Sequence, residues 1–545
     1  MAKKKNRTLH PDEPLLHPDH PRPVTRRDFL RQGFISGTGA ILAPSMLGML
    51  AGISPAYALS ADLEDLKIVC GIDNVAGKLP FICFDLAGGA NIAGSNVLVG
   101  YKGGIEDPLT TAGYSKLGVA GTMLPSFGGA DTNVDRSFGL PFHSKSAMLK
   151  GMKECFPDIT KDTTKINGAV IPARSANDTG NNPHNPMYGI YKAGASGKIM
   201  DLIGSRNSDS GGNSLAPASM IDLSVRPTKI DRQSDVLGLV DTGEMANKMG
   251  VKNATRVMEA IERISQAKLS NANVQTGLND TVPGSSPAET YDAKIKRQIK
   301  CNYVQSAGMV EEYGDPGTLD VDKDKFINPA AQGADPLEIA FGSNNYTSDP
   351  EFRKTASVMK MVVNGFAGAG TISMGGFDYH TGNRTTGEAR DLRAGRCIGA
   401  CLRYAELVGK PLMVYVFSDG SLASNGSVDP ADPDGKLVWT GDNSSTACSF
   451  FLVYNPNGQP SLLGATPEQQ MQRQQLGGWF RQDASVETNN STPMANNVNS
   501  LVESVILNYM ALQGKEGQFE TLFPKHSLGN ATLRDSMTAF GQIVA

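Results

Sequence analysis

The chain has 545 residues, of which 19% are charged and 40% hydrophobic, and its formal net charge at pH 7 is −4. This length suits one large globular domain or two ordinary ones. Beyond an N-terminal leader there is no basic run or basic-aromatic stripe, which argues against nucleic acid as a partner. No stretch beyond the leader approaches about 20 continuous apolar residues, so we expect no stable membrane span there.

The leader has the features of a twin-arginine export signal. Arg26 and Arg27 are followed by Phe-Leu and then by a mildly apolar, Gly- and Ala-rich run over 33–53. An A-x-A cleavage pattern ends at Ala58, directly before Leu59. This combination looks like a twin-arginine signal peptide. We therefore expect the twin-arginine translocase as a partner and the periplasm or the cell exterior as the destination. Polar and helix-breaking residues interrupt the apolar run, which favours cleavage over an uncleaved anchor.

The predicted domain boundaries follow from this leader: residues 1–58 are the signal peptide and leader, and 59–545 form the mature chain. The leader holds eight of the 51 Lys and Arg residues and four of the 55 Asp and Glu residues, so the mature chain has a net charge of −8. All seven cysteines lie in the mature chain, and an odd number cannot all pair. Cys397 and Cys401 lie four apart on a predicted helix; two small buried residues are favoured over a metal or redox pair.

The mature chain alternates predicted strands with predicted helices. Short apolar runs predict strands at 79–85, 166–171, 371–375, 411–417 and 448–454. Helical periodicity over 353–366 and 388–408 places helices between the later strands. This alternation predicts an α/β fold with a mostly parallel central sheet covered by helices.

Between about 205 and 345 the pattern changes to long helices, at roughly 243–270 and 287–313, and we interpret this region as a helical insertion. Asp320, Asp322 and Asp324 briefly resemble a calcium loop. An EF-hand is disfavoured, because Lys325 stands where Gly is needed and Ala331 where Glu is needed.

Polar residues follow the predicted strands at the edge where open α/β sheets bind ligands. Asp378 and His380 follow the strand at 371–375, and Asp419 follows the strand at 411–417. Asp442 precedes the strand at 448–454, and Asp85 ends the strand at 79–85. Asp and His one residue apart can both reach a cation if the turn points both inward. The alternatives are hydrogen-bonded turns, caps, or buried partners of backbone amides.

The order of these motifs resembles an uncharacterised, sulfatase-like family of twin-arginine-exported bacterial proteins within the alkaline phosphatase superfamily. The family has a Gly-Gly-aromatic-Asp-x-His motif, which matches residues 375–380. Its Ser-Glu-Phe-Gly-Arg strand end is similar to 418–420, and its Gly-Thr-Asp-His-Gly motif to 440–443. Its early Gly-Gly-x-Asp motif is similar to 88–91, and a Ser-His element to 183–184. The resemblance implies a three-layer sandwich fold of the alkaline phosphatase and sulfatase type.

Several motif positions depart from the family pattern. Asn91 stands where the family has Asp, Asp419 where it has Glu, and Asn443 where it has His. The superfamily hydrolyses phosphate or sulfate esters with one or two divalent metals and a Ser or Thr nucleophile. The candidate metal ligands are listed together here: Asp378, His380, Asp442, Asp85, Asp419 and Asn91. Because Asn443 replaces a histidine, we expect the site to hold at most one divalent ion, which would be calcium, magnesium or zinc. The alternative is a site that holds no ion.

Two functions follow from the resemblance. The first is an exported protein with a degraded metal site that has a binding or surface-assembly role. The alternative is a metal-dependent hydrolase of phosphate or sulfate esters. The substitutions at Asn91 and Asn443 favour the first, and Ser175 and Ser418 are the candidate nucleophiles for the second.

The export prediction can be tested directly. Arg26→Lys combined with Arg27→Lys should leave precursor in the cytoplasm, because the signal depends on the arginine pair. Cell fractionation measures this, and N-terminal sequencing of the exported protein should begin at or near Leu59. Undiminished periplasmic protein from the double variant would contradict the prediction.

Overall fold

A computed structural model describes most of the chain between residues 60 and 544. The described residues are 60–70, 78–129, 131–175, 182–237, 250–271, 278–282, 288–313, 318–432, 435–489 and 492–544. The predictions for Arg26, Arg27, Ala58 and Leu59 therefore lie outside the described residues. Among the described residues, no helix combines the length and the apolar character needed to cross a bilayer.

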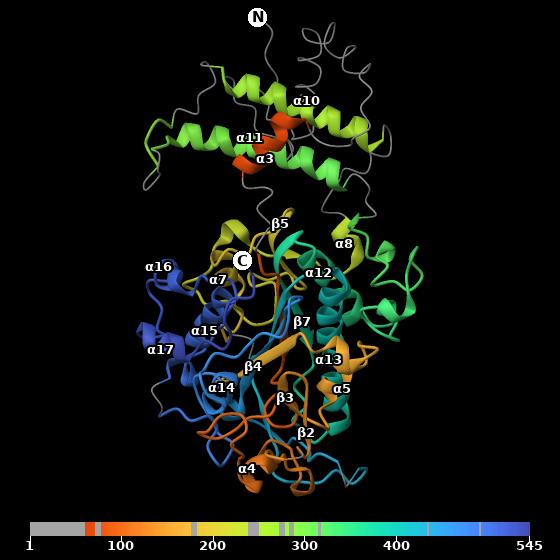
Figure 1. Ribbon diagram of the computed structural model, residues 1–545, viewed down its shortest axis with the longest axis vertical. Coiled ribbons are helices and arrows are strands. Elements are labelled where there is room, and N and C mark those ends of the chain that lie inside the picture. Colours follow the sequence, from red (N-terminus) through yellow and green to blue (C-terminus); the bar gives the residue numbers. More distant parts are fainter. Residues whose placement is uncertain are drawn as a thin grey trace, which may run out of the picture. The chain divides into compact units, whose positions relative to one another are not determined.

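A seven-stranded sheet with the order β4-β11-β8-β1-β7-β5-β6 forms the centre of an α/β body (Figure 1). In this sheet β11 runs antiparallel to its neighbours β4 and β8, and the pairings among β8, β1, β7, β5 and β6 are parallel. The strands of the sheet are β1 (Phe81–Ala87), β4 (Ile166–Pro172), β5 (Met200–Gly204), β6 (Thr228–Lys229), β7 (Ala367–Gly375), β8 (Leu412–Ser418) and β11 (Cys448–Tyr454). Two short hairpins lie outside it: β2 (Val134–Phe138) with β3 (Leu140–His143), and β9 (Leu422–Ala423) with β10 (Gly441–Asp442). The predicted mostly parallel sheet is confirmed, and the five predicted strands all belong to it.

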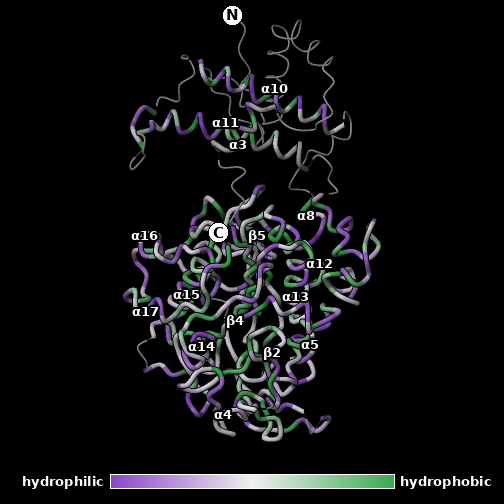
Figure 2. The backbone as a smooth tube through the Cα atoms, in the orientation of Figure 1, coloured by the Kyte–Doolittle hydropathy of each residue, from purple (hydrophilic) through white to green (hydrophobic). Residues whose placement is uncertain are grey.

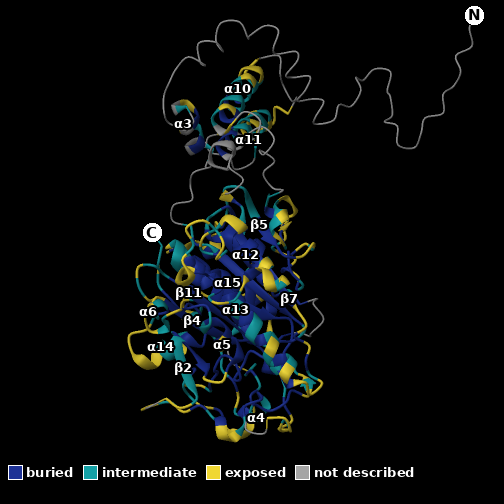
Figure 3. Ribbon diagram, turned by 90° about the vertical axis from the view of Figure 1, so that its right-hand side faces the viewer, coloured by how far each residue is buried: buried dark blue, intermediate teal, exposed yellow. Residues whose placement is uncertain are grey.

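The strands are apolar on both faces because both faces are covered. Every residue of β1, β4, β8 and β11 is buried. In β8, Val414 and Val416 contribute to one hydrophobic cluster, whereas Tyr415 and Phe417 contribute to the other. This is the period of two expected for a strand between two layers. Figure 2 shows hydrophobic residues along these central segments, and Figure 3 shows the same segments buried.

Helices cover both faces of the sheet. Buried side chains of α5 (Ala147–Lys153), α12 (Pro350–Val363) and α13 (Arg384–Val408) belong to the cluster that contains Val414. Those of α7 (Met187–Lys192) and α15 (Val498–Ala511) belong to the cluster that contains Tyr415. The remaining short helices of the body are α4 (Thr111–Lys116), α6 (Ile159–Asp162), α8 (Gln233–Leu237), α14 (Pro467–Gln474), α16 (Phe519–Leu522) and α17 (Ala531–Ser536). This arrangement is compatible with a three-layer sandwich.

The predicted long helices at 243–270 and 287–313 are observed as α10 (Val251–Leu269) and α11 (Tyr291–Tyr313). With α3 (Ala61–Val69), they enclose a small cluster around Leu63, Val304 and Ala307. Other parts of the predicted insertion belong to the α/β body, because β6 joins the sheet and Phe341 is buried in its core. Asp324, the third aspartate of the calcium-like pattern, accepts hydrogen bonds from Lys360 Nζ at 2.6 Å and from the Tyr404 hydroxyl at 2.7 Å. Its carboxylate is therefore bonded to two protein side chains.

A disulfide joins Cys70, directly after α3, to Cys301 of α11. The other five cysteines, among them Cys397 and Cys401, are buried free thiols. Burial raises the pKa of Cys397 to about 12 and that of Cys401 well above its ordinary value. Thiols that stay protonated are poor nucleophiles and poor metal ligands, so the interpretation as two buried small residues is the one supported.

Because the centre of the sheet is buried, we expect a charged side chain introduced there to destabilise the protein strongly. Val414→Asp should lower the free energy of unfolding by roughly 2–5 kcal/mol, because a buried carboxyl without a partner is costly. Val414 is 0% exposed, whereas Val428 is 50% exposed and serves as a matched control. Urea unfolding of Val414→Asp and Val428→Asp checks the difference. Equal midpoints for the two variants would contradict the predicted burial.

Candidate functional site

Three of the predicted ligands converge at the carboxyl edge of the sheet. One ligand atom each of Asp378, His380 and Asp442 lies within 4.8 Å of the other two. The Nδ1 atom of His380 contacts the carboxylate of Asp378 and lies 3.0 Å from Asp442 Oδ1. The three side chains are 57%, 31% and 42% exposed, in the order Asp378, His380, Asp442, so a dissolved ion or ligand can reach them.

Close backbone packing positions Asp378. The turn after β7 contains Gly376 at a φ of +88°, where a Cβ would meet the guanidinium of Arg390. A Cβ on Gly88, which has a φ of +115°, would lie 2.6 Å from Asp378 N. At Gly88 both the conformation and the backbone of the neighbouring turn exclude a side chain, whereas at Gly376 the positive φ favours glycine and the Arg390 side chain would have to move. The two glycine pairs noted in the sequence therefore let the turns after β1 and β7 touch.

Asp442 comes from a different part of the chain. It lies in β10 and pairs with Leu422 of β9. The strand β9 begins just after the turn that follows β8. Gly382 N donates to Trp439 O at 2.9 Å, and the Tyr379 ring meets the Trp439 ring edge-on at 5.4 Å. These two contacts hold the β10 segment beside the 378–380 turn.

Tyr379 lies between the exposed Asp378 and the partly exposed His380 and is itself buried. Its hydroxyl donates to Asp391 Oδ1 at 3.1 Å and accepts from Asn91 N at 3.2 Å. Asp391 Oδ2 also accepts from Asn96 Nδ2 at 2.8 Å. Tyr379 thus fixes the turn to α13 and to the segment after β1, which orients Asp378 and His380 outward.

Asp391 is an unusual acid because it lies fully buried in α13. Burial raises its pKa to about 7, and the charge of Glu388 adds to the rise. Hydrogen bonds from Asn96 and Tyr379 and the charge of Lys436 oppose it. Nothing in the sequence marked this residue, since it lies within a regular helix and belongs to no motif.

Asp85 is placed away from the exposed cluster and has a structural role. Its carboxylate accepts from the backbone amides of Asn213 at 2.6 Å and Ser214 at 2.7 Å, and from the Ser214 hydroxyl at 3.2 Å. Burial, together with the charge of Asp419, raises its pKa to about 6. Asn213 and Ser214 belong to no motif in the sequence and lie in the segment interpreted as an insertion.

Asp419 and Asn91 are also buried and hydrogen-bonded. Asp419 Oδ1 accepts from Gly88 N at 2.8 Å, and Oδ2 accepts from Asn213 Nδ2 at 3.1 Å. This matches the alternative interpretation of Asp419 as a partner for a backbone amide. Asn91 Nδ2 donates to Ser95 Oγ, whereas Asn91 Oδ1 has no hydrogen-bond partner in the described part of the chain. Asp419 is thus hydrogen-bonded to the backbone of Gly88, and the backbone of Asn91 is hydrogen-bonded to the Tyr379 hydroxyl.

The candidate nucleophiles are buried. The Ser418 hydroxyl donates to Leu86 O at 2.6 Å and accepts from Ala90 N at 2.8 Å, so it ties two strand ends together. Ser175 is 3% exposed, and its hydroxyl has no partner among described residues. His184 stacks on Phe417, and burial lowers its pKa to about 3. None of these three residues belongs to the group that contains His380.

The exposed cluster offers two carboxylates and one imidazole. Carboxylate oxygens suit calcium and magnesium, and imidazole nitrogen suits zinc. Three protein ligands on an exposed edge leave positions for water, which fits one ion. Comparison of the chain with protein-family models, curated proteins and solved structures finds no match in any of the three.

The raised pKa of Asp391 predicts a pH-dependent stability. A carboxyl whose pKa rises from 3.8 to about 7 stabilises the folded state while it is protonated. This contribution is complete below about pH 4 and is lost as pH rises through about 7. The free energy of unfolding should therefore fall less steeply between pH 4.5 and 7.5 in Asp391→Asn than in the unchanged protein.

Urea unfolding over this pH range measures the difference in slope. Asp65→Asn, at an exposed position of α3, is the control and should keep the original slope. Parallel pH profiles for Asp391→Asn and the unchanged protein would rule out a titrating Asp391.

Proposed function

We propose that the protein is exported by the twin-arginine pathway and binds one divalent cation through Asp378, His380 and Asp442. In this proposal the fold is that of the sulfatase and alkaline phosphatase superfamily, and the cation site serves binding or surface assembly. The observation that carries the proposal is the convergence of three ligand-type side chains within 4.8 Å from segments more than 60 residues apart in sequence.

Two features support export. The leader carries the arginine pair and the A-x-A pattern. The Cys70–Cys301 disulfide is typical of proteins that work in an oxidising compartment, since cytosolic thiols are kept reduced. The leader and the disulfide are independent of each other, and both favour the periplasm or the cell exterior.

The charge balance supports cation binding of modest strength. Two carboxylates face each other across His380, and a divalent ion would relieve their repulsion. The amino end of α13, capped by Asn383, follows three residues after His380 and carries a partial positive charge. High exposure also screens the carboxylates. We therefore expect a weaker site than a buried cage of carboxylates would form.

The alternative proposal, a hydrolase of phosphate or sulfate esters, rests on the openness of the site at the carboxyl edge. A ligand can reach His380, and ligands of α/β proteins bind at this edge. Against hydrolysis, Ser418 Oγ is engaged in two hydrogen bonds and Ser175 is buried. A nucleophile in hydrogen-bond reach of the reacting atom is what nucleophilic catalysis requires, so we favour the binding role.

Titration calorimetry of the mature protein with calcium, magnesium and zinc tests the proposal. One equivalent of ion should bind, and Asp442→Asn should weaken binding at least about tenfold, because a charged ligand is lost. Asp65→Asn removes a carboxylate from an exposed helix position and should leave the affinity unchanged. Equal affinities for Asp442→Asn and the unchanged protein would refute the site.

An activity assay separates the two functions. Generic phosphate and sulfate esters are supplied together with each metal, and turnover should be slow or absent. Robust turnover that His380→Ala abolishes would refute the binding role and establish the hydrolase.

A further inference from the structure

The helix α3, which begins three residues after the predicted cleavage point, packs against α10 and α11 (Figure 1). Its apolar contact is small, because the buried cluster there consists of Leu63, Val304 and Ala307. The Cys70–Cys301 disulfide fastens the carboxyl end of α3 to α11. So small a cluster stabilises a helix of 9 residues only slightly, so the polar contacts at the amino end of α3 become important.

Side chains of α10 hold this amino end. The backbone N–H of Ser60 donates to Glu259 Oε1 at 2.8 Å. Arg263 Nη2 donates to the Ser60 hydroxyl at 2.6 Å and to Asp62 Oδ1 at 3.1 Å. Because Ser60 lies directly before α3, these bonds fix the direction from which the chain enters the helix.

Glu262, one helical turn after Glu259, carries a buried carboxylate that these bonds leave unused. Glu262 is 1% exposed, and neither carboxylate oxygen has a hydrogen-bond partner among the described residues. Burial raises the pKa of this carboxyl, against the charges of Lys300 and Arg263. The charges of Asp62 and Glu259 add to the rise, which shows that Glu262 lies near the start of α3. A buried carboxylate without a partner is costly, so a positively charged group is expected to complete this place.

Cleavage after Ala58 supplies a positively charged group. Hydrolysis of the peptide bond adds the hydroxyl of water to the carbonyl carbon of Ala58 and a hydrogen to the nitrogen of Leu59. The new α-amino group takes up a further proton at neutral pH. Covalent geometry keeps this nitrogen within about 3.7 Å of Ser60 N, which lies 2.8 Å from Glu259 Oε1. The ammonium therefore forms within about 6.5 Å of a carboxylate oxygen.

The charge of α3 itself makes the two glutamates necessary for such an ammonium. The amino end of a helix carries a partial charge of about +0.5, which disfavours a cation close before it. Glu259 and Glu262 offset this repulsion. In the uncleaved precursor the nitrogen of Leu59 belongs to a neutral amide, so the glutamates receive no counter-charge from it.

We propose that Glu259 and Glu262 form the binding site for the amino terminus that signal cleavage creates, and that processing thereby locks α3 onto α10. The inference rests on the proposed export, because a signal peptidase has to supply the free amine. It assigns a function to Glu262, a residue that has no role in the cation site.

The reactivity of the amino terminus measures this pairing. The exported protein is treated at about pH 7.5 with an amine-reactive acetyl ester, and acetylation of the first residue is followed by mass spectrometry. Only the neutral amine reacts, and nearby carboxylates keep it protonated by raising its pKa. Glu262→Gln should therefore label about tenfold faster, which corresponds to a pKa change of about one unit. Glu338→Gln, which removes an exposed carboxylate elsewhere, is the matched control and should keep the original rate.

A second variant moves the amine without changing either glutamate. One glycine inserted between Ala58 and Leu59 keeps the A-x-A pattern and shifts the ammonium by about 3.6 Å. This protein should also label about tenfold faster, and thermal unfolding checks that both variants are folded. Labelling of Glu262→Gln and of the insertion variant at the original rate would overturn the proposal.

N-terminal sequencing of the same samples separates this inference from export. A terminus at Leu59 together with unchanged labelling rates would refute the glutamate site and leave export intact. An uncleaved leader in the exported protein would refute the processing step, and the proposed site with it.

Discussion

The hydroxyl of Tyr379, held by the buried carboxyl of Asp391, fixes the geometry of the candidate cation site. Asp378 is exposed and His380 is partly exposed, and such side chains in a turn do not keep one arrangement by themselves. The residue between them is buried and bonded to α13 and to Asn91. Its ring also contacts Trp439, three residues before Asp442. One buried side chain thus connects all segments that supply the ligands.

Helix ends of opposite partial charge lie at the two edges of the sheet. α12 and α13 run antiparallel to the strands that follow them, so their amino ends lie at the carboxyl edge and their carboxyl ends at the amino edge. Carboxylates at one edge and lysines at the other each complement these helix ends.

The sequence predicted the sheet well because its strands are buried on both faces. Residues 411–417 form an uninterrupted apolar run, and β8 occupies Leu412–Ser418. Convergence of Asp378, His380 and Asp442 was predictable from the rule that ligands gather at the carboxyl edge. Asp85 and Asp419 follow the same rule in sequence, but the structure buries them against Asn213 and Gly88. Sequence position alone does not distinguish an exposed ligand from a carboxylate that holds a loop.

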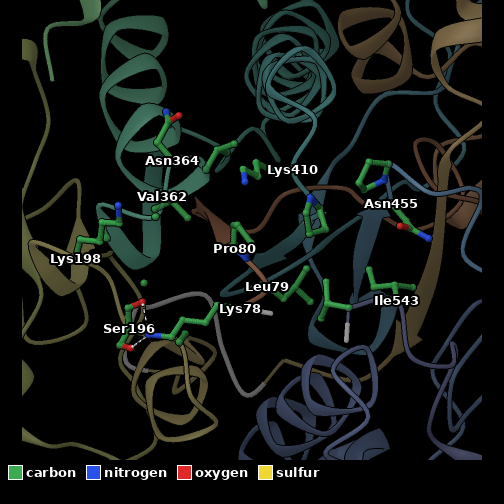
Figure 4. Close-up of a pocket in the computed structure, with 18 of the residues that line it drawn as sticks. Lys78, Leu79, Pro80, Ser196, Lys198, Val362, Asn364, Lys410, Asn455 and Ile543 are labelled. Carbon is green, nitrogen blue, oxygen red and sulfur yellow. Dashed lines mark hydrogen bonds between the residues drawn. The ribbon is translucent and has the colours of Figure 1, made fainter. Parts of the chain in front are cut away.

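Other features carry no local signal. Cys70 and Cys301 are separated by 231 residues, so only their positions in three dimensions reveal the disulfide. Asp391 lies among ordinary helix residues, and its raised pKa results from burial by segments distant in sequence. The residues that line a cavity at the amino edge of the sheet likewise come from unconnected segments (Figure 4). Such features result from the packing of distant segments, which neither periodicity nor motif spacing describes.

We propose that one cation binds between Asp378, His380 and Asp442. Crystals of the protein soaked in manganese, with diffraction measured near the manganese absorption edge, show whether it does. A single anomalous peak should lie within about 2.0–2.6 Å of a ligand atom from each of the three residues. A map without a peak between them, or with the only peak beside other side chains, would contradict it.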